Sequence, residues 1–365
     1  MDAGITVKDD RVVSGEGVPP SSLAGVSPAG RYVTQQVREG KMPSRRAGET
    51  PASLQLLDIT VLMGGPSSER EVSIQTGSAI SDALRRLGHS VTQSDISPAN
   101  LTALDREGMD LVFIALHGAF GEDGQVQAVC EERHLRYVGS PPSASSKAMD
   151  KAASKEVFRR AGIATPDWAV VTIANMVRMH GRLEELGLPA VVKPIDGGSS
   201  VDVTIARDPA ARDQAVAACV AKYGRALVER FVSGKEVTVG VLGRQVLPVI
   251  EIRPAHAFYD YEAKYTDCGT QYIFDHGLGE SVVAALGAEA MAAHDALGCR
   301  DLSRVDFIVD ARGVAHLLEI NTIPGFTSHS LLPMAARRAG IGFDQLVARL
   351  VEMAMRRGPQ REKVD

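Results

Sequence analysis

Short apolar runs alternate with amphipathic segments from residue 57 onward. The run "LDITVLMGG" (57–65) ends in two glycines, which is typical of a buried strand that enters a tight turn. In the segment that follows, Ile74, Ile80 and Leu84 recur at helical spacing, so we predict an amphipathic helix with these side chains on its inner face. Gly88 stands where that helix should end.

A glycine-rich loop follows the next two apolar runs. These runs, "SVTQSD" (90–95) and "DLVFIAL" (110–116), are predicted strands, and their alternation with the helix favours a parallel sheet. The stretch "HGAFGEDG" (117–124) is too rich in glycine for a regular element, so we predict a loop at the C-terminal end of a strand. Ligands bind at that end of open α/β sheets, which makes this loop a candidate binding element.

Two further units are predicted after residue 150, and the whole chain has the pattern of a mixed α/β fold. The first unit opens with a helix that Gly162 closes, and its second helix is predicted over roughly 208–222. Its strands are predicted in "WAVVTI" (168–173), "PAVVKP" (189–194), "VTIA" (203–206) and "RALVERFV" (225–232). The second unit is predicted to contain two strands around Gly243, a polar loop over 253–280 and a hairpin, "SRVDFIVDARGVAHLLEIN" (303–321), that turns at "ARG".

The first 56 residues differ from the rest in composition. They mix glycine, proline and serine with both signs of charge and show no sustained apolar period. We therefore predict a disordered or loosely attached extension over 1–56 with no part in the chemistry. A second interpretation is an overlong start, because Met42 lies inside it. The remainder is predicted to form three domains, at 57–150, 151–235 and 236–357.

Composition narrows the functional classes. The chain has 365 residues, of which 44% are hydrophobic and 23% charged, and the formal net charge is −5. This balance argues against nucleic acid or an anionic membrane as a partner, since either favours a basic surface. Four scattered cysteines without a CxxC pair, an acidic start and no apolar run of ~18 residues favour a cytoplasmic location.

Three oxygen donors recur near the end of the predicted hairpin. Glu319 and Asn321 lie two residues apart on one strand, so they share a face, while Ile320 points the other way. The turn at 311–313 could bring Asp306 beside them. Two carboxylates and an amide are ligands that suit Mg²⁺ and leave positions for phosphate oxygens and water. The alternative is a solvent-facing polar stripe, which the apolar flanks of both strands disfavour.

Candidate groups for a nucleotide precede the hairpin. Lys193 ends an apolar strand, and "GGSS" follows it with backbone N–H groups and two hydroxyls for an anion. Lys151 is a second candidate for phosphate, and Glu229 and Glu236 are candidates for an adenine amino group and a ribose hydroxyl. Each signal is weak by itself, because such a lysine is commonly a surface residue and such a loop commonly a linker. The chain has no P-loop motif, nor a G-x-G-x-x-G after its first strand.

In this order, the motifs resemble those of the ATP-grasp enzymes and, more narrowly, of the D-alanine–D-alanine ligase family. The resemblance covers about 57–355. It rests on "MGGPSSEREVS" (63–73), "ALHGAFGEDG" (115–124), "MDK" (149–151), "VVKPIDGGSSV" (191–201), "VERFVSGKEVTV" (228–239), "FYDYEAKY" (258–265), "SRVDF" (303–307) and "LLEINTIPGFTSHSLLPMAA" (317–336). It implies an ATP-grasp fold behind a small parallel-sheet N-terminal domain.

The resemblance also implies roles for individual residues. Those expected to contact ATP are Lys151, Lys193, Glu229, Arg230, Val232, Glu236 and Lys264. Those expected to hold two Mg²⁺ ions, or Mn²⁺, are Asp306, Glu319 and Asn321. Those expected at the two amino acids are Glu69, His117, Ser330 and Leu331, with Arg304 and the N–H of Gly325 at the oxyanion. A closing triad is expected from Glu69, Ser199 and Tyr265.

The implied reaction joins two D-alanine molecules with ATP through an acyl phosphate, in the cytoplasm, for peptidoglycan precursor synthesis. A carboxylate is a poor electrophile, so it must first be phosphorylated, by positioning and charge neutralisation. The acyl phosphate needs shelter from water, which explains a lid made of the glycine-rich and 253–280 loops. A homodimer is a family expectation.

Several positions depart from the family pattern. Asp202 stands where glycine is usual, Gly197 where an acid is common and Arg230 where lysine is common, and "FDH" (274–276) replaces a segment that often reads Cys-Pro-Ala. Asp202 could alter the mobility of the glycine-serine loop or its charge. The triad and metal residues are intact, so we expect an active enzyme.

Three other functions are compatible with part of the sequence. Another ATP-grasp carboxylate–amine ligase should lack "SEREVS" and "TSHS", which are present here. A D-alanine–D-lactate ligase often lacks the tyrosine found at Tyr265. A non-catalytic nucleotide-binding module should lose metal ligands or Arg304.

Overall fold

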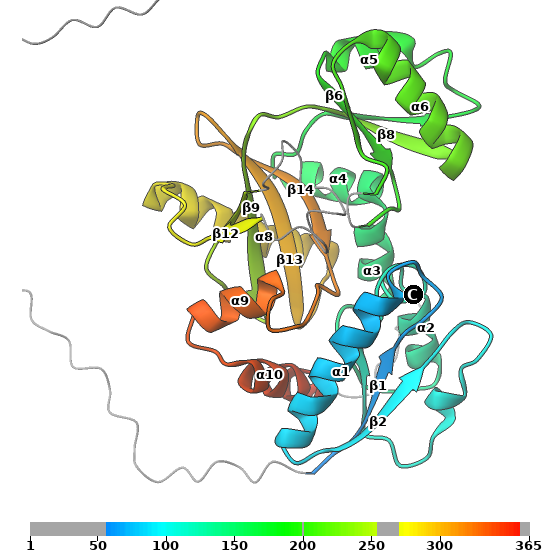
Figure 1. Cartoon of the computed structure of the whole chain (residues 1–365), viewed down its shortest axis with the longest axis vertical. Helices are drawn as coiled ribbons and strands as arrows, with labels where there is room; N and C mark the ends of the chain where they lie inside the picture. The colour runs from blue at the N-terminus through cyan, green and yellow to red at the C-terminus, as the bar shows by residue number, and fades with distance from the viewer. Residues whose placement is uncertain (1–55, 199–200, 254–269, 358–365) are drawn as a thin grey trace, which may run out of the picture. The chain divides into compact units, whose positions relative to one another are not determined.

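The computed structural model describes residues 56–198, 201–253 and 270–357 (Figure 1). The predicted extension over 1–56 lies outside this part of the chain except for Leu56, so its state stays a prediction. Three sheets organise the described residues, and helices pack against them. The mixed α/β class is confirmed, whereas the domain limits proposed near 150 and 235 stay predictions.

The first sheet is parallel, as the alternation of elements predicted. Its order is β2-β1-β3-β4, with β1 at Asp58–Met63, β2 at Ser90–Asp95, β3 at Leu111–Ile114 and β4 at Tyr137–Val138. The helices of this region are α1 (Arg70–Arg86), the 3-10 helix η1 (Thr102–Asp105) and α2 (Gln125–Glu132). The loop at 117–124 joins β3 to α2 and therefore lies at the C-terminal end of β3, as predicted.

Helix α1 packs closely on β1 through a face of mostly small side chains. Ile80 and Leu84 are buried as predicted, whereas Ile74 is only partly buried. A Cβ added to Gly77 would lie 2.6 Å from the Cβ of Met63, so a larger residue would push the helix off the strand. The close packing holds the N-terminal end of α1, which follows Glu69, against the end of the sheet.

The second sheet is antiparallel. Its order is β5-β8-β6-β7, with β5 at Trp168–Thr172, β6 at Ala190–Pro194, β7 at Thr204–Ala206 and β8 at Arg225–Arg230. The helices before and within this region are α3 (Pro142–Met149), α4 (Lys151–Arg160), α5 (His180–Leu186) and α6 (Pro209–Tyr223). Asp150 caps α4, because its Oδ1 accepts the N–H of Ala153 at 2.8 Å, and this cap fixes Lys151 as the first helical residue.

The third sheet carries the predicted hairpin. Its main path is β12-β11-β9-β13-β14, with β9 at Gly234–Leu242, β11 at Ile250–Arg253, β12 at Gln271–Ile273, β13 at Leu302–Asp310 and β14 at Ala315–Asn321. The short strand β10 (Gln245–Val246) pairs with β9. The helices are α8 (Glu280–Leu297), α9 (Leu331–Arg338) and α10 (Phe343–Arg356). All pairings in this sheet are antiparallel.

Two predictions for this region were incomplete. The segment after Gly243 forms two strands instead of one. Both β10 and β11 pair with β9, and Pro248, which lacks an N–H, lies between them and interrupts that pairing. The predicted polar loop at 253–280 contains β12 in its described part, and 254–269 lie outside the described residues.

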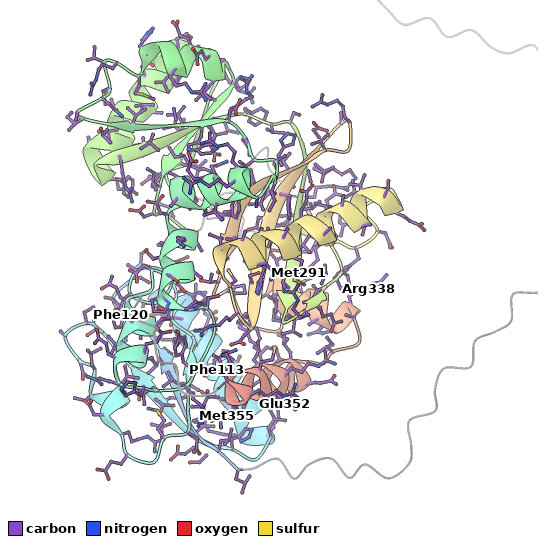
Figure 2. All side chains as sticks on the ribbon, turned by 180° about the vertical axis from the view of Figure 1, so that it is seen from behind. Phe113, Phe120, Met291, Arg338, Glu352 and Met355 are labelled. Carbon is purple, nitrogen blue, oxygen red and sulfur yellow. The ribbon has the colours of Figure 1, made fainter. Side chains whose placement is uncertain are left out.

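The C-terminal helix α10 packs back onto the first sheet. Leu346 and Leu350 of α10 belong to the same buried cluster as Leu84 of α1 and Phe113 of β3. Figure 2 labels Phe113 together with Met355, which packs against that cluster from α10. The first and last described segments therefore share one core. Within the described ranges, no helix combines the length and apolar character needed to cross a membrane.

Candidate active site

A cavity of about 410 Å³ is lined by residues of the second and third sheets and, from the first region, by helix α1, the turn before it and the loop after β3. The predicted nucleotide contacts that line it are Lys151, Lys193, Glu229, Arg230, Val232 and Glu236. The predicted metal ligands that line it are Asp306, Glu319 and Asn321. The predicted amino-acid and oxyanion contacts that line it are Glu69, His117, Arg304, Gly325, Ser330 and Leu331. Ser199, Lys264 and Tyr265 lie outside the described residues, so their roles stay predictions.

The hairpin places the candidate metal ligands together. In the register of β13 and β14, Asp306 lies opposite Glu319 and Arg304 lies opposite Asn321. Ile320 is 3% exposed and points into the core, as the alternation predicted. The two carboxylates and the amide therefore meet on the cavity side of the hairpin, as expected from the sequence.

An irregularity in the hairpin decides which face Glu319 occupies. The register shifts between Asp306 and Phe307, whose partners are Glu319 and Leu317, so Leu318 is an extra residue in β14. Leu317 is fully buried, and strict alternation from it would turn Glu319 into the core. The bulge reverses that alternation and turns Glu319 toward the cavity.

Cations of the chain neutralise the candidate metal ligands. Arg304 donates to Asp306 through Nε at 3.0 Å and Nη2 at 2.8 Å, and Thr238 donates its hydroxyl to Asp306 Oδ1 at 2.6 Å. Lys151 Nζ lies 3.3 Å from Glu319 Oε2 and also donates to the carbonyl of Gly197. Each carboxylate therefore has a positively charged neighbour that a metal ion could replace.

The end of the cavity that carries the predicted nucleotide contacts is built around one buried carboxylate. Glu229 is 2% exposed, and its two oxygens lie 2.9 Å from Lys155 Nζ and 2.7 Å from Lys193 Nζ. Burial alone would raise the pKa of Glu229, but the two ammonium groups outweigh burial and hold that pKa below its usual value. Glu229 is therefore an ionised acceptor at the wall of the cavity.

The other predicted nucleotide contacts lie at the end of β8, in the link that follows it, and near the start of β9. Arg230 has a half-exposed side chain and donates Nη2 to the carbonyl of Glu185 at 3.1 Å. Val232 lies between the two strands, and Glu236 stands on β9 opposite Ile308 of β13. The link from β8 to β9 thus forms one wall of the cavity.

Glu69 lies between two glycine-rich segments. A Cβ on Gly118 would be 3.0 Å from Glu69 Oε2, and one on Gly198 would be 3.4 Å from the same oxygen. Ser67 anchors this turn, since its hydroxyl donates to the carbonyl of His117 at 2.6 Å and accepts the N–H of Glu69 at 3.1 Å. The carboxylate of Glu69 is thereby brought close to both loops.

His117 is held by two neighbours that the sequence analysis did not single out. Its Nε2 lies 3.1 Å from the hydroxyl of Thr76, and its Nδ1 lies 3.1 Å from Glu122 Oε1. Burial raises the pKa of Glu122, and His117 partly offsets that effect. Glu122 also lines the cavity. Its position within the candidate binding loop "HGAFGEDG" was the feature of the sequence that could have identified it as a site residue.

The segment after β14 forms the opposite wall. Ser330 precedes α9, and its Oγ accepts the N–H of Thr327 at 3.0 Å and lies 2.9 Å from the Thr327 hydroxyl. Leu331 is the first residue of that helix. The backbone N–H groups at this helix start suit a carboxylate, and the role expected for Ser330 and Leu331 stays a prediction.

The departures from the family pattern can be placed in part. Asp202 has φ +55, a conformation that glycine adopts readily, and its carboxylate accepts hydrogen bonds from Lys222 and Tyr223. Gly197 lines the cavity. In segment 274–276, the carbonyl of His276 accepts a hydrogen bond from Lys235. Nothing in the structure explains why these residues replace the usual ones.

Two more residues were missed by the sequence analysis. Lys155 and Thr238 contact Glu229 and Asp306 from behind the cavity wall. Lys155 follows Lys151 by one helical turn, and Thr238 follows Glu236 by two strand positions. These spacings could have indicated that both side chains lie near the site. However, no pattern in the sequence shows which residue a buried side chain contacts.

Family models match most of the described chain. A model described as D-ala D-ala ligase C-terminus matches residues 157–352, and one described as D-ala D-ala ligase N-terminus matches residues 97–140. A D-alanine–D-alanine ligase from Syntrophotalea carbinolica is 45% identical over 302 residues, which are 82% of this chain and 96% of that protein. One from Anaeromyxobacter sp. (strain K) is 43% identical over 296 residues, 81% of this chain and 96% of that protein.

Solved structures of similar proteins have the same fold. A D-alanine–D-alanine ligase from Bacillus anthracis complexed with ATP matches with a TM-score of 0.72 and 32% identity, over 82% of this chain and 98% of that one. The VanG D-Ala:D-Ser ligase from Enterococcus faecalis matches with a TM-score of 0.73 and 28% identity, over 82% of this chain and 100% of that one. The second amino acid is therefore a point on which similar proteins differ.

Proposed function

The chain belongs to the D-alanine–D-alanine ligase family, and we propose that it joins two D-alanine molecules into D-alanyl-D-alanine while converting ATP to ADP and phosphate. The observation that carries the proposal is the single cavity in which the described nucleotide, metal and amino-acid candidates meet. The product serves peptidoglycan precursor synthesis.

The nucleotide occupies the end of the cavity formed by the second sheet. Lys151 and Lys193 meet the phosphates of ATP, where two ammonium groups offset the charge that a triphosphate brings. Glu229 accepts a hydrogen bond from the amino group of adenine. The remaining contacts with the base and the ribose come from Arg230, Val232, Glu236 and Lys264. The lowered pKa of Glu229 supports this role, because an ionised carboxylate only accepts hydrogen bonds and accepts them more strongly than a protonated carboxyl group.

Asp306, Glu319 and Asn321 would hold two Mg²⁺ ions, for which Mn²⁺ could substitute. The donor set fits a hard divalent cation, because two carboxylates and an amide share one face and each carboxylate already attracts a cation of the chain. When bound, the metal neutralises phosphate charge. Arg304, which pairs with Asp306 in this structure, would be positioned to meet the reacting carboxyl group if a cation took its place beside Asp306.

The chain's own groups position the two amino acids. Glu69 binds the ammonium of the first D-alanine and His117 lies near its carboxylate, whose oxygen attacks the γ-phosphorus as ADP leaves. The neutral amine of the second D-alanine attacks the resulting acyl phosphate. Arg304 and the N–H of Gly325 stabilise the tetrahedral oxyanion, which expels phosphate and forms the peptide bond.

Ser330 and Leu331 receive the carboxylate of the second D-alanine. The Ser330 hydroxyl is already oriented by Thr327, and the N–H of Leu331 lies at a helix start. The expected triad of Glu69, Ser199 and Tyr265 would close the site over the acyl phosphate. Two of its members lie outside the described residues, and only Glu69 is placed here.

Phosphate release tests the proposed reaction. With ATP, Mg²⁺ and D-alanine, the full-length protein should release phosphate and form one dipeptide per phosphate, whereas L-alanine should give little. D-lactate and D-serine, each offered with D-alanine, report on the second site. Equal turnover with L-alanine, or dipeptide formation without ATP, would overturn the proposal.

We also propose a cytoplasmic homodimer without nucleic acid or membrane partners. The family resemblance supports the dimer, and the net charge of −5 supports the absence of polyanionic partners. Sedimentation equilibrium of the full chain should give twice the monomer mass of 38.8 kDa.

A further inference from the structure

Lys155 is a buried lysine that the proposed reaction does not use. It lies one turn after Lys151 in α4, and its side chain is 0% exposed. Its Nζ lies 2.9 Å from Glu229 Oε1 and donates to the Thr165 hydroxyl at 2.6 Å and to the Pro166 carbonyl at 3.2 Å. Polar partners therefore surround this ammonium group.

Glu229 is shared between two lysines with different surroundings. Lys193 takes Oε2 at 2.7 Å and lines the cavity, whereas Lys155 takes Oε1 and does not line it. Lys193 can reach a ligand in the cavity, but Lys155 is held behind the wall by Thr165 and Pro166. Only one of the two lysines is therefore available to a nucleotide.

The second lysine removes a conflict at this site. If Lys193 were the sole counterion of Glu229, turning its ammonium toward phosphate would leave a buried carboxylate without compensation, which is strongly unfavourable. Such a pair would hold Lys193 back and weaken nucleotide binding. With Lys155 on the other oxygen, Glu229 keeps a counterion wherever Lys193 points.

We propose that Lys155 is a positioning residue of the ATP site, a permanent counterion of Glu229 that frees Lys193 to bind the phosphates of ATP. This inference rests on the proposed function, in which Lys193 meets the phosphates. Lys155 acts through Glu229 and Lys193 and touches no substrate itself.

The ionisation of the group agrees with this role. Burial lowers the pKa of Lys155 to about 8, with Lys193 acting in the same direction and Glu229 in the opposite one. The ammonium form is thus present at neutral pH because of Glu229. Asp167, just before β5, also favours it.

A double-mutant cycle separates this role from a structural one. Lys155→Met removes the charge and keeps the length, Glu229→Gln removes the carboxylate charge, and the third variant combines them. ATP dissociation constants are measured by calorimetry on folded full-length protein. We expect Lys155→Met to weaken ATP binding by roughly tenfold in the wild-type background, yet to change it little in the Glu229→Gln background, where Lys193 has no charged partner.

Partial ligands locate the effect. Inorganic tripolyphosphate should lose affinity for Lys155→Met as ATP does, while adenosine should bind about equally to both proteins. The charge-preserving Lys155→Arg should retain most of the ATP affinity. Steady-state kinetics should show a raised KM for ATP with a smaller change in kcat, because chemistry follows binding. If Lys155→Met does not fold, Lys155→Gln replaces it throughout, since an amide can still bond Thr165 and Pro166.

Three outcomes would overturn the inference. One is an equal loss of ATP affinity from Lys155→Met in both backgrounds, which indicates a purely structural role. Another is a loss confined to adenosine, and the third is no loss at all. Failure of the proposed function would be seen differently, as a wild-type protein that binds no ATP or releases no phosphate with D-alanine.

Discussion

The two ends of the cavity balance their charges in opposite ways. At the nucleotide end, one carboxylate, Glu229, lies between two lysines and its side chain is 3% exposed. At the end that carries the proposed metal ligands, Asp306 lies beside Arg304 and Glu319 beside Lys151 in the described part of the chain, and the Glu319 side chain is 29% exposed. The first arrangement has an excess of positive charge, and the second can accept further positive charge, such as a metal ion.

This difference separates a carboxylate whose counterions belong to the fold, Glu229, from carboxylates whose counterions can be exchanged, Asp306 and Glu319. A buried carboxylate with two counterions keeps its charge compensated when one counterion moves, so Glu229 serves folding and binding together. Carboxylates that line a cavity and contact side-chain cations can exchange those cations for metal ions with little loss of fold stability.

Glu229→Ala should destabilise the fold most. It would leave Lys155 and Lys193 buried without their carboxylate, and breaking a buried pair in this way costs about 3–5 kcal/mol. Urea unfolding at neutral pH measures the change. The matched variant Glu319→Ala, at the exposed end, should be less destabilised by several-fold, and equal losses would break the comparison.

Glu319→Ala should instead abolish most of the activity. Removal of a metal ligand should reduce kcat by about 10²–10³-fold at saturating Mg²⁺, while the melting temperature changes little. Dipeptide formation with ATP and D-alanine gives the rate. A near-normal rate would mean that Glu319 does not hold metal, and Glu319→Gln controls for the loss of side-chain volume.

Thr238→Val should weaken metal binding without a large loss of stability. The Thr238 hydroxyl orients Asp306 at 2.6 Å, and such supporting hydrogen bonds affect metal affinity by about tenfold or more. The measurement is Mn²⁺ binding by paramagnetic resonance in the presence of a non-hydrolysable ATP analogue. Thr238→Ser keeps the hydroxyl and should bind normally, so equal affinity in all three proteins would contradict the prediction.

Asp202→Asn should cause the smallest loss of fold stability, and the size of that loss should depend on pH. Hydrogen bonds from Lys222 and Tyr223 hold the pKa of Asp202 below its usual value. A lowered pKa stabilises the fold above the unfolded-state pKa of about 4, and this contribution disappears as pH falls through the folded value. Both partners are exposed, so Asn should lower the melting temperature by only about 1 °C at pH 7, and by progressively less as the pH falls below about 4. A large or pH-independent change would contradict this assignment.

Local sequence patterns were sufficient to predict most strands and some helices. The apolar runs at β1, β6, β8 and β13 and the turn at Gly313 were all predicted, because alternation and glycine report directly on local geometry. The sequence analysis assigned neither α8 nor α10. Alanine on several sides of α8 weakens its periodicity, whereas Leu346, Val347, Leu350 and Val351 give α10 a clear apolar face that could have been used.

The sequence by itself determined the family and the set of chemical groups at the site. Motifs such as "SEREVS" and "NTIPGFTSHS" do so because a shared reaction needs particular groups in a particular order. It also placed Asp306 on the strand next to Glu319 and Asn321, since the predicted turn at 311–313 joins the two strands, whereas the direct pairing of Asp306 with Glu319 depends on the bulge at Leu318.

Only the tertiary structure decided how those groups are held and charged. Strict alternation from Leu317 places Glu319 in the core, and the bulge at Leu318 turns it to the cavity. Lys155 and Thr238 come from elements far from Glu229 and Asp306 in the chain, and their contacts follow from how α4 and β9 pack. Ionisation depends on burial and on neighbours distant in sequence, which no local pattern specifies.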